Sequence, residues 1–307
     1  MNSFDLLILG AGPAGFSAAI YAKRAGLNVG IIEKSVPGGA VAITQEVCNY
    51  PGIKSIGGME LAAQMFEHMT SLGVEIIFDE VVSTDFSGKE KFIKCLKGEY
   101  TAKTVLIAIG AAARKLNLNN ERDYLGRGLS YCATCDGTLF KGKTVAVVGG
   151  GNSALEDAVY MSGLADKVYL IHRRGEFRGD DILEKTVRAN QNVELMLYSR
   201  ISALEGKPNL KQIELENIQD GTTKKLNTEG VFVAIGRGPD TEVIDKNVAK
   251  NEAGYIIADE KMRTNIEGVY VAGDIRDTPL RQIVTATADG AIAATSAFGF
   301  IKSGKFR

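Results

Sequence analysis

The chain has 307 residues, a length that predicts two domains. Its composition, 45% hydrophobic and 24% charged, is that of a globular protein with a full core and excludes a disordered chain. The net charge is −1 with acidic and basic residues interspersed, so charge offers no basis for binding nucleic acid or an anionic membrane.

Cysteine usage and the N-terminus indicate the compartment. The four cysteines are too few for a disulfide scaffold, and only Cys132 and Cys135 are spaced as a pair, while Cys48 and Cys95 stand alone. The N-terminal residues lack a basic region and lead straight into an apolar run, so we expect no signal peptide. These features predict a cytoplasmic protein.

The N-terminal segment predicts a strand, a helix and a second strand around a glycine-rich loop. Residues 6–9 form a continuous apolar run, as in a strand buried on both faces, and an apolar strand at 28–32 ends at Glu33. Glycines between strand and helix let the backbone approach a pyrophosphate at the helix N-terminus, and Glu33 stands where a ribose-binding acid belongs. We therefore predict a dinucleotide site formed by Gly10, Gly12, Pro13, Ala14, Gly15 and Glu33. The alternative is a glycine-rich turn that binds nothing.

Further helices and strands complete the first half of the chain. The segment 59–72 predicts a helix with Leu61, Met65 and Met69 on one face, which we expect to pack in the core. A short strand at 74–78, a β-meander over 80–103 and a buried strand over 104–110 follow.

The middle of the chain repeats this plan. A strand over 144–148, the loop GGGNSA from Gly149, a helix over 154–162 and a strand over 167–171 form a second dinucleotide fold. A second meander covers about 193–228, and the strand over 230–236 echoes the one over 104–110. We therefore predict two copies of one architecture, each of which binds a dinucleotide.

The two copies differ at the end of their second strand. His172 stands at the same offset from Gly149 as Glu33 does from Gly10, and arginines follow it. An acid accepts hydrogen bonds from a ribose 2′-OH and repels a 2′-phosphate, whereas arginines bind the phosphate. The first site should hold an unphosphorylated adenosine, and therefore FAD, since FMN has no adenosine ribose. The second should hold NADPH through Gly149, Gly151, Asn152, Ser153, His172, Arg173, Arg174 and Arg178. The alternative is that these arginines form a solvated basic turn.

The C-terminal segment lacks a nucleotide loop of its own. It predicts a strand over 268–272 and a long apolar helix from about Gln282. The apolar stretch 283–301 contains one charge, Asp289, and several Thr and Ser residues, so we expect a buried helix rather than a membrane span. This tail most simply completes the first domain. The predicted fold class is α/β, with two Rossmann-like three-layer nucleotide-binding domains: residues 1–114 and 244–307 form the first, and residues 115–243 are inserted as the second.

The segment Cys132-Ala133-Thr134-Cys135-Asp136 lies just ahead of the second nucleotide loop. Two cysteines two residues apart can close a disulfide, bind a metal or exchange electrons. Zinc would need two more ligands, but Cys48 and Cys95 do not form a second pair and the chain has only 2 histidines. Together with two nucleotide loops, the pair predicts an electron relay from nicotinamide through flavin to a disulfide.

The chain resembles the low-molecular-weight thioredoxin reductases along essentially its whole length. The resemblance rests on GAGPAG at 10, Asn49-Tyr50-Pro51-Gly52, CATCDG at 132, GGGNSA at 149, HRRGEFR at 172 and AGDIRD at 272. It implies FAD in the first domain, NADPH in the second, and a homodimer. Further positions that it assigns to FAD are Thr44, Asn49, Gly110, Gly273, Asp274, Arg281, Gln282 and Ile283.

The resemblance also implies roles. Cys135 would face the flavin, Cys132 would attack the disulfide of thioredoxin, Asp136 would manage the proton, and Arg127 matches a position that holds thioredoxin. The inserted domain would rotate on pivots at 111–115 and 237–240. One departure is Ala40, where the family usually has Gln, which leaves the effect on flavin potential open. Another is Cys48, which replaces a common acid and which we interpret as an incidental thiol.

The predicted function is therefore the NADPH-dependent reduction of thioredoxin. Alternatives are ferredoxin as electron donor, another disulfide as acceptor, a dithiol oxidase that uses oxygen, and a flavin-bearing binding or sensor protein without turnover. The arginines at 173, 174 and 178 argue against ferredoxin, which needs no 2′-phosphate clamp.

Overall fold

The apolar run at the start of the chain forms an inner strand of a parallel sheet. The computed structural model describes residues 2–44 and 46–304. Strand β1 (Asn2–Leu9) pairs in parallel with β2 (Val29–Glu33) on one side and β8 (Glu99–Ile107) on the other. Leu6 and Ile8 belong to one hydrophobic core and Leu7 and Leu9 to another. The strand is thus buried on both faces, which confirms the prediction from its unbroken apolar sequence.

Strand β8 joins the parallel and antiparallel parts of this sheet, whose order is β5-β2-β1-β8-β7-β6. Its first residues pair antiparallel with β7 (Lys91–Cys95), and its last pair in parallel with β19 (Val269–Val271). The last strand of the predicted meander and the predicted strand over 104–110 are therefore one continuous strand. The remaining strands are β5 (Glu75–Phe78) and β6 (Val81–Asp85).

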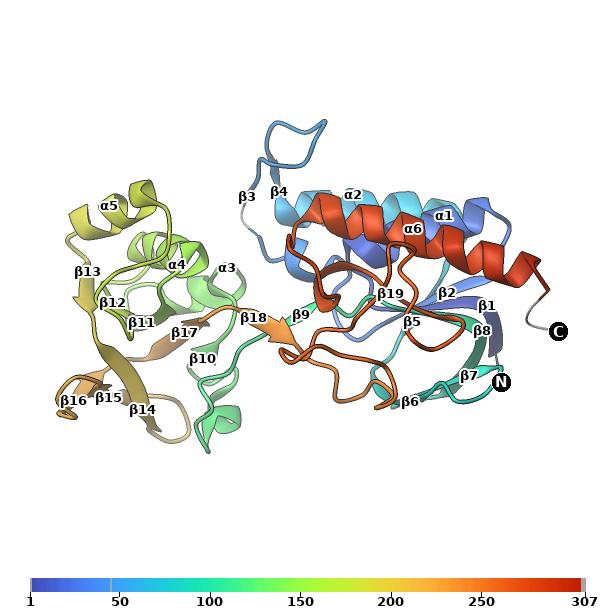
Figure 1. Ribbon diagram of the computed structural model, residues 1–307. Helices are drawn as coiled ribbons and strands as arrows, with labels where there is room; N and C mark the ends of the chain where they lie inside the picture. Colours follow the sequence, from blue (N-terminus) through green and yellow to red (C-terminus); the bar gives the residue numbers. More distant parts are fainter. Residues whose placement is uncertain (1, 45, 305–307) are drawn as a thin grey trace. The chain divides into compact units, whose positions relative to one another are not determined.

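Helices α1 (Pro13–Arg24), α2 (Gly58–Ser71) and α6 (Ile283–Lys302) lie together over this sheet (Figure 1). Helices α1 and α6 approach backbone to backbone, because a side chain at Gly290 would place its Cβ 2.1 Å from the carbonyl oxygen of Ala14. Helix α6 is long and apolar enough to cross a membrane by length and composition, and 33% of its most apolar stretch is buried in the fold. Its alanines at 286, 293, 294 and 297 pack in the core, so the helix is buried along one face and not throughout as we had expected.

The opposite core of the sheet is closed by the meander and by chain that follows the second unit. Phe86 and Ile93 pack there with Ile244, Val248 and Ile256. Short elements border the loops of this unit: η1 (Gly39–Val41), β3 (Glu46–Val47), β4 (Ile56–Gly57) and η4 (Gly273–Ile275).

The second unit repeats the parallel sheet. Its order is β10-β17-β11-β12-β13, with all neighbours parallel. Val145 and Val147 belong to one core of this unit, and Ala146 and Val148 to the other. The strands are β10 (Leu129–Ser130), β11 (Thr144–Gly149), β12 (Lys167–Ile171), β13 (Val193–Met196) and β17 (Gly230–Ala234). The helices are η2 (Glu121–Tyr124), α3 (Ala133–Asp136), η3 (Gly137–Phe140), α4 (Asn152–Ser162) and α5 (Asp181–Ala189).

The second meander is shorter than the sequence predicts. It consists of β14 (Ser199–Glu205), β15 (Gln212–Asn217) and β16 (Thr223–Asn227). The predicted meander began at 193, but β13 pairs in parallel with β12 and so extends the nucleotide-binding sheet. A single strand carries no mark of its long-range partner, which is why the sequence placed β13 in the wrong sheet.

The chain divides into two compact units, one of residues up to Ala112 and from Pro239 onward, and one of Ala113–Gly238. We expected the inserted domain to run over 115–243. Residues 239–243 go with the first unit, because the carbonyl oxygen of Val243 accepts the Thr84 hydroxyl at 3.2 Å and Ile244 is buried in that core. The two connections, β9 (Ala111–Ala113) and β18 (Arg237–Pro239), pair with each other.

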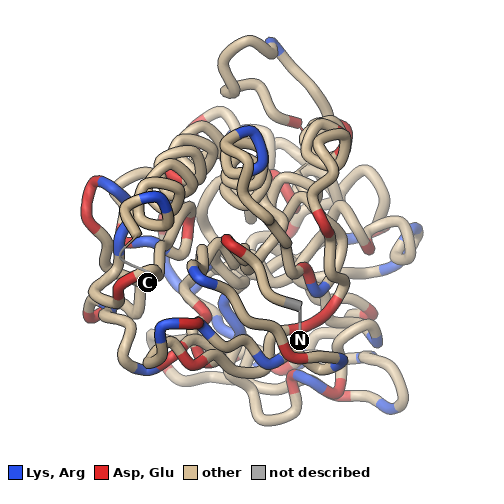
Figure 2. The backbone as a smooth tube through the Cα atoms, turned by 90° about the vertical axis from the view of Figure 1, so that its right-hand side faces the viewer, with Lys and Arg blue, Asp and Glu red and all other residues tan. Residues whose placement is uncertain are grey.

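Acidic and basic positions are mixed along the backbone rather than gathered by sign (Figure 2). This distribution agrees with the interspersed charges of the sequence.

Candidate active site

The first glycine-rich loop joins β1 to α1 and fits against two backbone segments. Gly10 has a left-handed φ of +106°, and a Cβ there would lie 2.5 Å from the carbonyl oxygen of Ala108. A Cβ at Gly15 would lie 2.1 Å from the carbonyl oxygen of Gly10, whereas a Cβ at Gly12 would meet nothing within 4 Å. The loop is therefore tight where it meets the fold and open at Gly12. Helix α1 begins at Pro13, so its N-terminus faces this opening.

Glu33 lies beside this loop, at the end of β2. Its Oε2 accepts the Ala11 N–H at 2.8 Å, and its Oε1 accepts the N–H and hydroxyl of Ser35. The carboxylate is thus fixed at the position where we predict a ribose contact. The sequence did not reveal Ser35, which helps to orient the acid.

The second glycine-rich loop has the same form. A Cβ at Gly149 would lie 2.3 Å from the carbonyl oxygen of Ala234, and a Cβ at Gly151 would meet nothing within 4 Å. Helix α4 begins directly after Gly151. The side chain of Asn152 pairs with Asp180: its Nδ2 donates to Oδ2 at 2.8 Å, and its Oδ1 accepts the Asp180 N–H at 2.8 Å. This amide joins the loop to residue 180, and the predicted cofactor contact of Asn152 stays a prediction. Ser153 beside it is exposed.

The ring of His172 packs against Gly150 of this loop. His172 is 5% exposed, its ring stacks on Phe177, and a Cβ at Gly150 would lie 2.1 Å from the His172 Cε1. Burial lowers the pKa of His172, and the positive charges of the neighbouring arginines add to this effect. The ring is therefore neutral near pH 7 and serves to shape the loop.

Arg173, Arg174 and Arg178 are all exposed around the buried histidine. The Arg178 N–H donates to the carbonyl oxygen of Gly150 at 2.7 Å, which ties the third arginine to the loop. The fold thus brings together the three cations that the sequence places at 173, 174 and 178. They can bind a phosphate group beside the second loop.

Cys132 and Cys135 form a disulfide at the start of α3. The Cys132 Sγ accepts the Cys135 N–H at 3.1 Å and lies 3.3 Å from the Thr134 Oγ1. These contacts would stabilise a Cys132 thiolate once the disulfide is reduced. Within residues 2–44 and 46–304, no three His, Cys, Asp or Glu side chains are grouped to hold a metal ion.

Ser130 connects the disulfide to Asp136. Its hydroxyl donates to the Asp136 Oδ2 at 2.6 Å, and its Oγ accepts the Cys132 N–H at 3.0 Å. Ser130 is buried. Sequence reasoning missed this residue, because a serine two positions before a cysteine carries no signal of a side chain that turns back toward an acid.

A buried carboxylate, Glu121, anchors the residue that precedes the disulfide. It accepts the hydroxyl of Tyr131 and the N–H groups of Leu116 and Asn117, both at 2.9 Å. Burial and the Glu121 hydrogen bond raise the pKa of Tyr131 well above its usual range. The sequence did not indicate this link between the residue before the disulfide and the segment 116–117, which follows β9.

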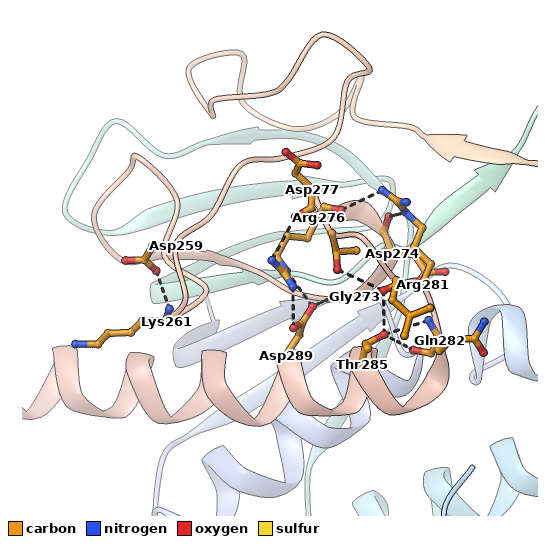
Figure 3. Close-up of polar contacts among 12 residues, drawn as sticks. Asp259, Lys261, Gly273, Asp274, Arg276, Asp277, Arg281, Gln282, Thr285 and Asp289 are labelled. Carbon is orange, nitrogen blue, oxygen red and sulfur yellow. Dashed lines mark hydrogen bonds and ion pairs between the residues drawn. The ribbon is translucent and has the colours of Figure 1, made fainter. Parts of the chain in front are cut away.

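Four of the other predicted flavin residues, Gly273, Asp274, Arg281 and Gln282, lie at or near the N-terminus of α6 (Figure 3). The Asn49 Nδ2 donates to the Gln282 Oε1 at 3.0 Å, and the Arg281 Nε donates to the carbonyl oxygen of Asp274 at 3.2 Å. Ile283 packs against the hydrophobic cluster of the 41–56 loop. Two predicted residues lie elsewhere: Thr44 donates its hydroxyl to the carbonyl oxygen of Ala40 at 2.9 Å, and Gly110 follows β8.

The two remaining cysteines differ in exposure. Cys48 is exposed, while Cys95 is buried in the sheet core. Burial, with the nearby Asp79 charge, raises the pKa of Cys95 to about 12. Cys95 is therefore protonated and unreactive at neutral pH.

Comparison with known proteins places this arrangement in a family. The model of the pyridine nucleotide-disulphide oxidoreductases matches residues 4–290. The thioredoxin reductase of Bacillus subtilis is 42% identical over 301 residues, covering 97% of this chain and 95% of that protein. The solved thioredoxin reductase of Lactococcus lactis, in its FR conformation, is 36% identical with a TM-score of 0.89, over 98% of this chain and 99% of that one. A ferredoxin-flavin thioredoxin reductase from Clostridium acetobutylicum is 30% identical with a TM-score of 0.56, over 99% of both chains.

The chain belongs to the pyridine nucleotide-disulphide oxidoreductase family. It is therefore an oxidoreductase that couples a pyridine nucleotide to a disulfide, and the thioredoxin reductases of this family use FAD and NADPH. Both loops fit such cofactors, because the first is open at Gly12 and the second at Gly151, each directly before a helix whose first N–H groups favour phosphate.

Proposed function

We propose that this protein transfers two electrons from NADPH to the disulfide of thioredoxin, giving NADP⁺ and the thioredoxin dithiol. The observation that carries this proposal is the Cys132–Cys135 disulfide, with Asp136 beside it, in the unit that also presents Arg173 and Arg174. The disulfide supplies the exchange chemistry and the arginines select the donor. The names of the similar proteins support thioredoxin as the acceptor.

The first unit would hold FAD, which supplies a two-electron relay between nicotinamide and disulfide. The open loop at Gly12 and the N-terminus of α1 would bind the pyrophosphate, and Glu33 the adenosine ribose. Asp274, Arg281 and the N-terminus of α6 would hold the rest of the cofactor, with Asn49 joined to Gln282 at the same place.

The second unit would hold NADPH at the open Gly151 loop. Arg173, Arg174 and Arg178 would bind the 2′-phosphate that distinguishes NADPH from NADH. His172, which we predicted as a contact, would act by shaping the loop.

The dithiol would reduce thioredoxin by two thiol exchanges. The Cys132 thiolate, stabilised by the Cys135 N–H and the Thr134 hydroxyl, would attack the thioredoxin disulfide, break it and form a mixed disulfide. Cys135 would then attack the Cys132 sulfur, release the second thioredoxin sulfur and restore the Cys132–Cys135 bond. Asp136, which accepts the Ser130 hydroxyl, would pass the cysteine protons to the two leaving thiolates.

The inserted unit would rotate between two poses during turnover. Its dithiol and its nicotinamide must each meet the flavin, and thioredoxin is too large to reach a disulfide that is enclosed there. Only two connections join the units, and they pair as β9 and β18, so motion about them needs no other covalent change. Residues 111–115 and 237–240 are the proposed pivots.

Partners and location follow from the same resemblance. Arg127, which precedes Cys132 in the chain, is exposed and is a candidate contact for thioredoxin. We infer a homodimer in the cytoplasm, and the exposed apolar side chains of α6, such as Val284 and Ile292, are candidates for the contact between protomers.

Ferredoxin is the second candidate donor, because one similar solved structure is a ferredoxin-flavin thioredoxin reductase. One assay separates the two: purified protein, a thioredoxin and a chromogenic disulfide, started with NADPH, NADH or reduced ferredoxin. We expect thiol formation with NADPH that depends on thioredoxin. Turnover with reduced ferredoxin but not with NADPH would refute the proposed donor.

A further inference from the structure

The apolar helix α6 contains one acidic residue, Asp289, and both of its carboxylate oxygens accept hydrogen bonds. Asp289 is 6% exposed. Its Oδ2 accepts the Gly273 N–H at 3.1 Å and the Arg276 Nε at 3.0 Å, and its Oδ1 accepts the Arg276 Nη2 at 3.1 Å (Figure 3). The Arg276 side chain is 17% exposed. This is a bidentate ion pair that also holds a backbone N–H.

Such a pair is a poor way to gain stability. Removing two charges from water is costly, and well-packed apolar residues in the same space are often as stable or more stable. What the pair adds over apolar residues is a defined orientation, because hydrogen bonds are directional. Its hydrogen bonds fix the Gly273–Arg276 segment relative to α6 in one geometry.

The Gly273–Arg276 segment begins in close contact with the N-termini of α1 and α6. Gly273 has a φ of +77°, and a Cβ there would lie 3.1 Å from the Cβ of Ala14 and 3.6 Å from that of Ala286. Ala14 lies in the first turn of α1, within the glycine-rich motif, and Ala286 lies in the first turn of α6. The Asp289 carboxylate therefore fixes the point where the dinucleotide loop, η4 and α6 meet.

The next residue, Asp274, is held on its other side. The Arg281 Nε donates to the carbonyl oxygen of Asp274 at 3.2 Å, and the Arg281 guanidinium stacks 4.0 Å from the ring centre of Tyr255. Asp274 is thus positioned by the bond from Gly273 to Asp289 before it and by the bond from Arg281 after it.

We propose that Asp289 and Arg276 are positioning residues for FAD, which set the backbone of Gly273 and Asp274 against α1 and α6. This inference rests on the proposed function only in placing FAD in the first unit. It does not depend on NADPH, on the dithiol or on the identity of the acceptor. A failure of thioredoxin turnover would leave it intact.

The test measures FAD binding to apoprotein by quenching of flavin fluorescence, with heat melting of the same apoprotein. Asp289→Asn leaves Arg276 without its charged partner, and we expect FAD affinity to fall about tenfold or more. Arg276→Lys keeps the charge but loses the fork, so it should lose less affinity than Asp289→Asn. The surface pair Arg263–Asp259 is the matched control. Asp259 binds an arginine at 2.6 Å and accepts two backbone N–H groups at 2.9 Å, and Asp259→Asn should leave FAD affinity unchanged.

A double variant separates positioning from stability. Asp289→Leu with Arg276→Leu replaces the pair by apolar side chains, so the apoprotein should melt near the wild-type temperature, yet the Gly273 N–H has lost its acceptor. We expect weakened FAD binding and an altered visible flavin spectrum in this stable protein. Wild-type FAD affinity in the double variant, or an equal loss in Asp259→Asn, would overturn the proposal.

Discussion

At the dithiol, the hydroxyl of Ser130 joins the Asp136 carboxylate to the backbone of Cys132. Ser130 donates to Asp136 at 2.6 Å and accepts the Cys132 N–H at 3.0 Å. In the proposed mechanism Asp136 takes part in two successive proton transfers, so its carboxylate must keep a fixed orientation. Ser130 therefore provides the orientation on which the proposed acid depends.

Replacing Ser130 by Ala should slow thioredoxin reduction, and should not slow reduction of the flavin by NADPH. General acid catalysis contributes about 10²–10⁴-fold, so loss of orientation should cost roughly tenfold to a hundredfold in kcat with thioredoxin. Rapid-mixing absorbance measures the two half-reactions separately. Ser202→Ala, which removes a hydroxyl bound to Glu214 at 3.0 Å in the same unit, is the control. Equal slowing of both half-reactions would show that Ser130 has no specific role at the dithiol.

The proposed selection of NADPH over NADH depends on Arg173 and Arg174. Replacing Arg173 and Arg174 by Ala should remove the preference for NADPH over NADH, chiefly by raising the KM for NADPH. Each charge-assisted phosphate contact contributes about 1.5–3 kcal/mol, or roughly tenfold or more in affinity. Steady-state kinetics with both nucleotides measures this, and Arg200→Ala, which breaks an exposed ion pair on β14, should leave the preference unchanged. A wild-type protein that uses NADH as well as NADPH would contradict the clamp.

Among the elements, η2 carries Glu121, whose carboxylate joins residues 116 and 117 to Tyr131, which directly precedes the disulfide. Glu121→Gln should destabilise the second unit by about 1–3 kcal/mol, because an amide cannot accept all the hydrogen bonds that the buried carboxylate accepts. Amide exchange should speed up at Leu116 and Asn117, which donate to Glu121. Exchange by mass spectrometry and urea unfolding measure both effects. Glu229→Gln, an exposed acid that accepts the Thr144 N–H at 3.2 Å, should change stability by much less. Unchanged exchange at 116 and 117 would mean that Glu121 does not hold this connection.

Local sequence patterns predicted most of the helices and strands. They did not predict which strands pair over long distances in the sequence. The strands at β1, β2, β11 and β12 and the helices α1, α2 and α6 were predicted because apolar runs, periodicity and glycine stops are local signals. Strand β13 was placed in the wrong sheet, since its partner residues in β12 lie 25 positions earlier in the chain (193 − 168 = 25). Helix α5 was missed because it has nine residues, mostly polar, and only Val187 is buried.

The site shows the same division. The residues of the glycine-rich loops and the cysteine pair are local motifs, and the sequence could name them. Ser130, Glu121 and the Arg276–Asp289 pair act through side chains that cross loops or helices, and no spacing rule announces them. The buried position of His172 was also beyond sequence reasoning, because its place beneath Gly150 follows from the packing of Phe177.

For the whole molecule, the proposed rotation makes a clear prediction. A crosslink that fixes the inserted unit with its dithiol at the flavin should block flavin reduction by NADPH, because nicotinamide is bound by the same unit. The fully crosslinked protein should lose thioredoxin turnover, and reductive cleavage of the crosslink should restore it. Normal turnover in a sample shown to be completely crosslinked would mean that rotation is not part of the mechanism.

The most direct test of the relay compares Cys132→Ser and Cys135→Ser with the wild type in single-turnover experiments. NADPH is mixed with each protein while the visible flavin absorbance is followed, and thioredoxin is then added to measure thiol formation. We predict that NADPH reduces the flavin in all three proteins, and that only the wild type reduces thioredoxin. Full thioredoxin turnover by either serine variant would contradict a relay through the Cys132–Cys135 disulfide.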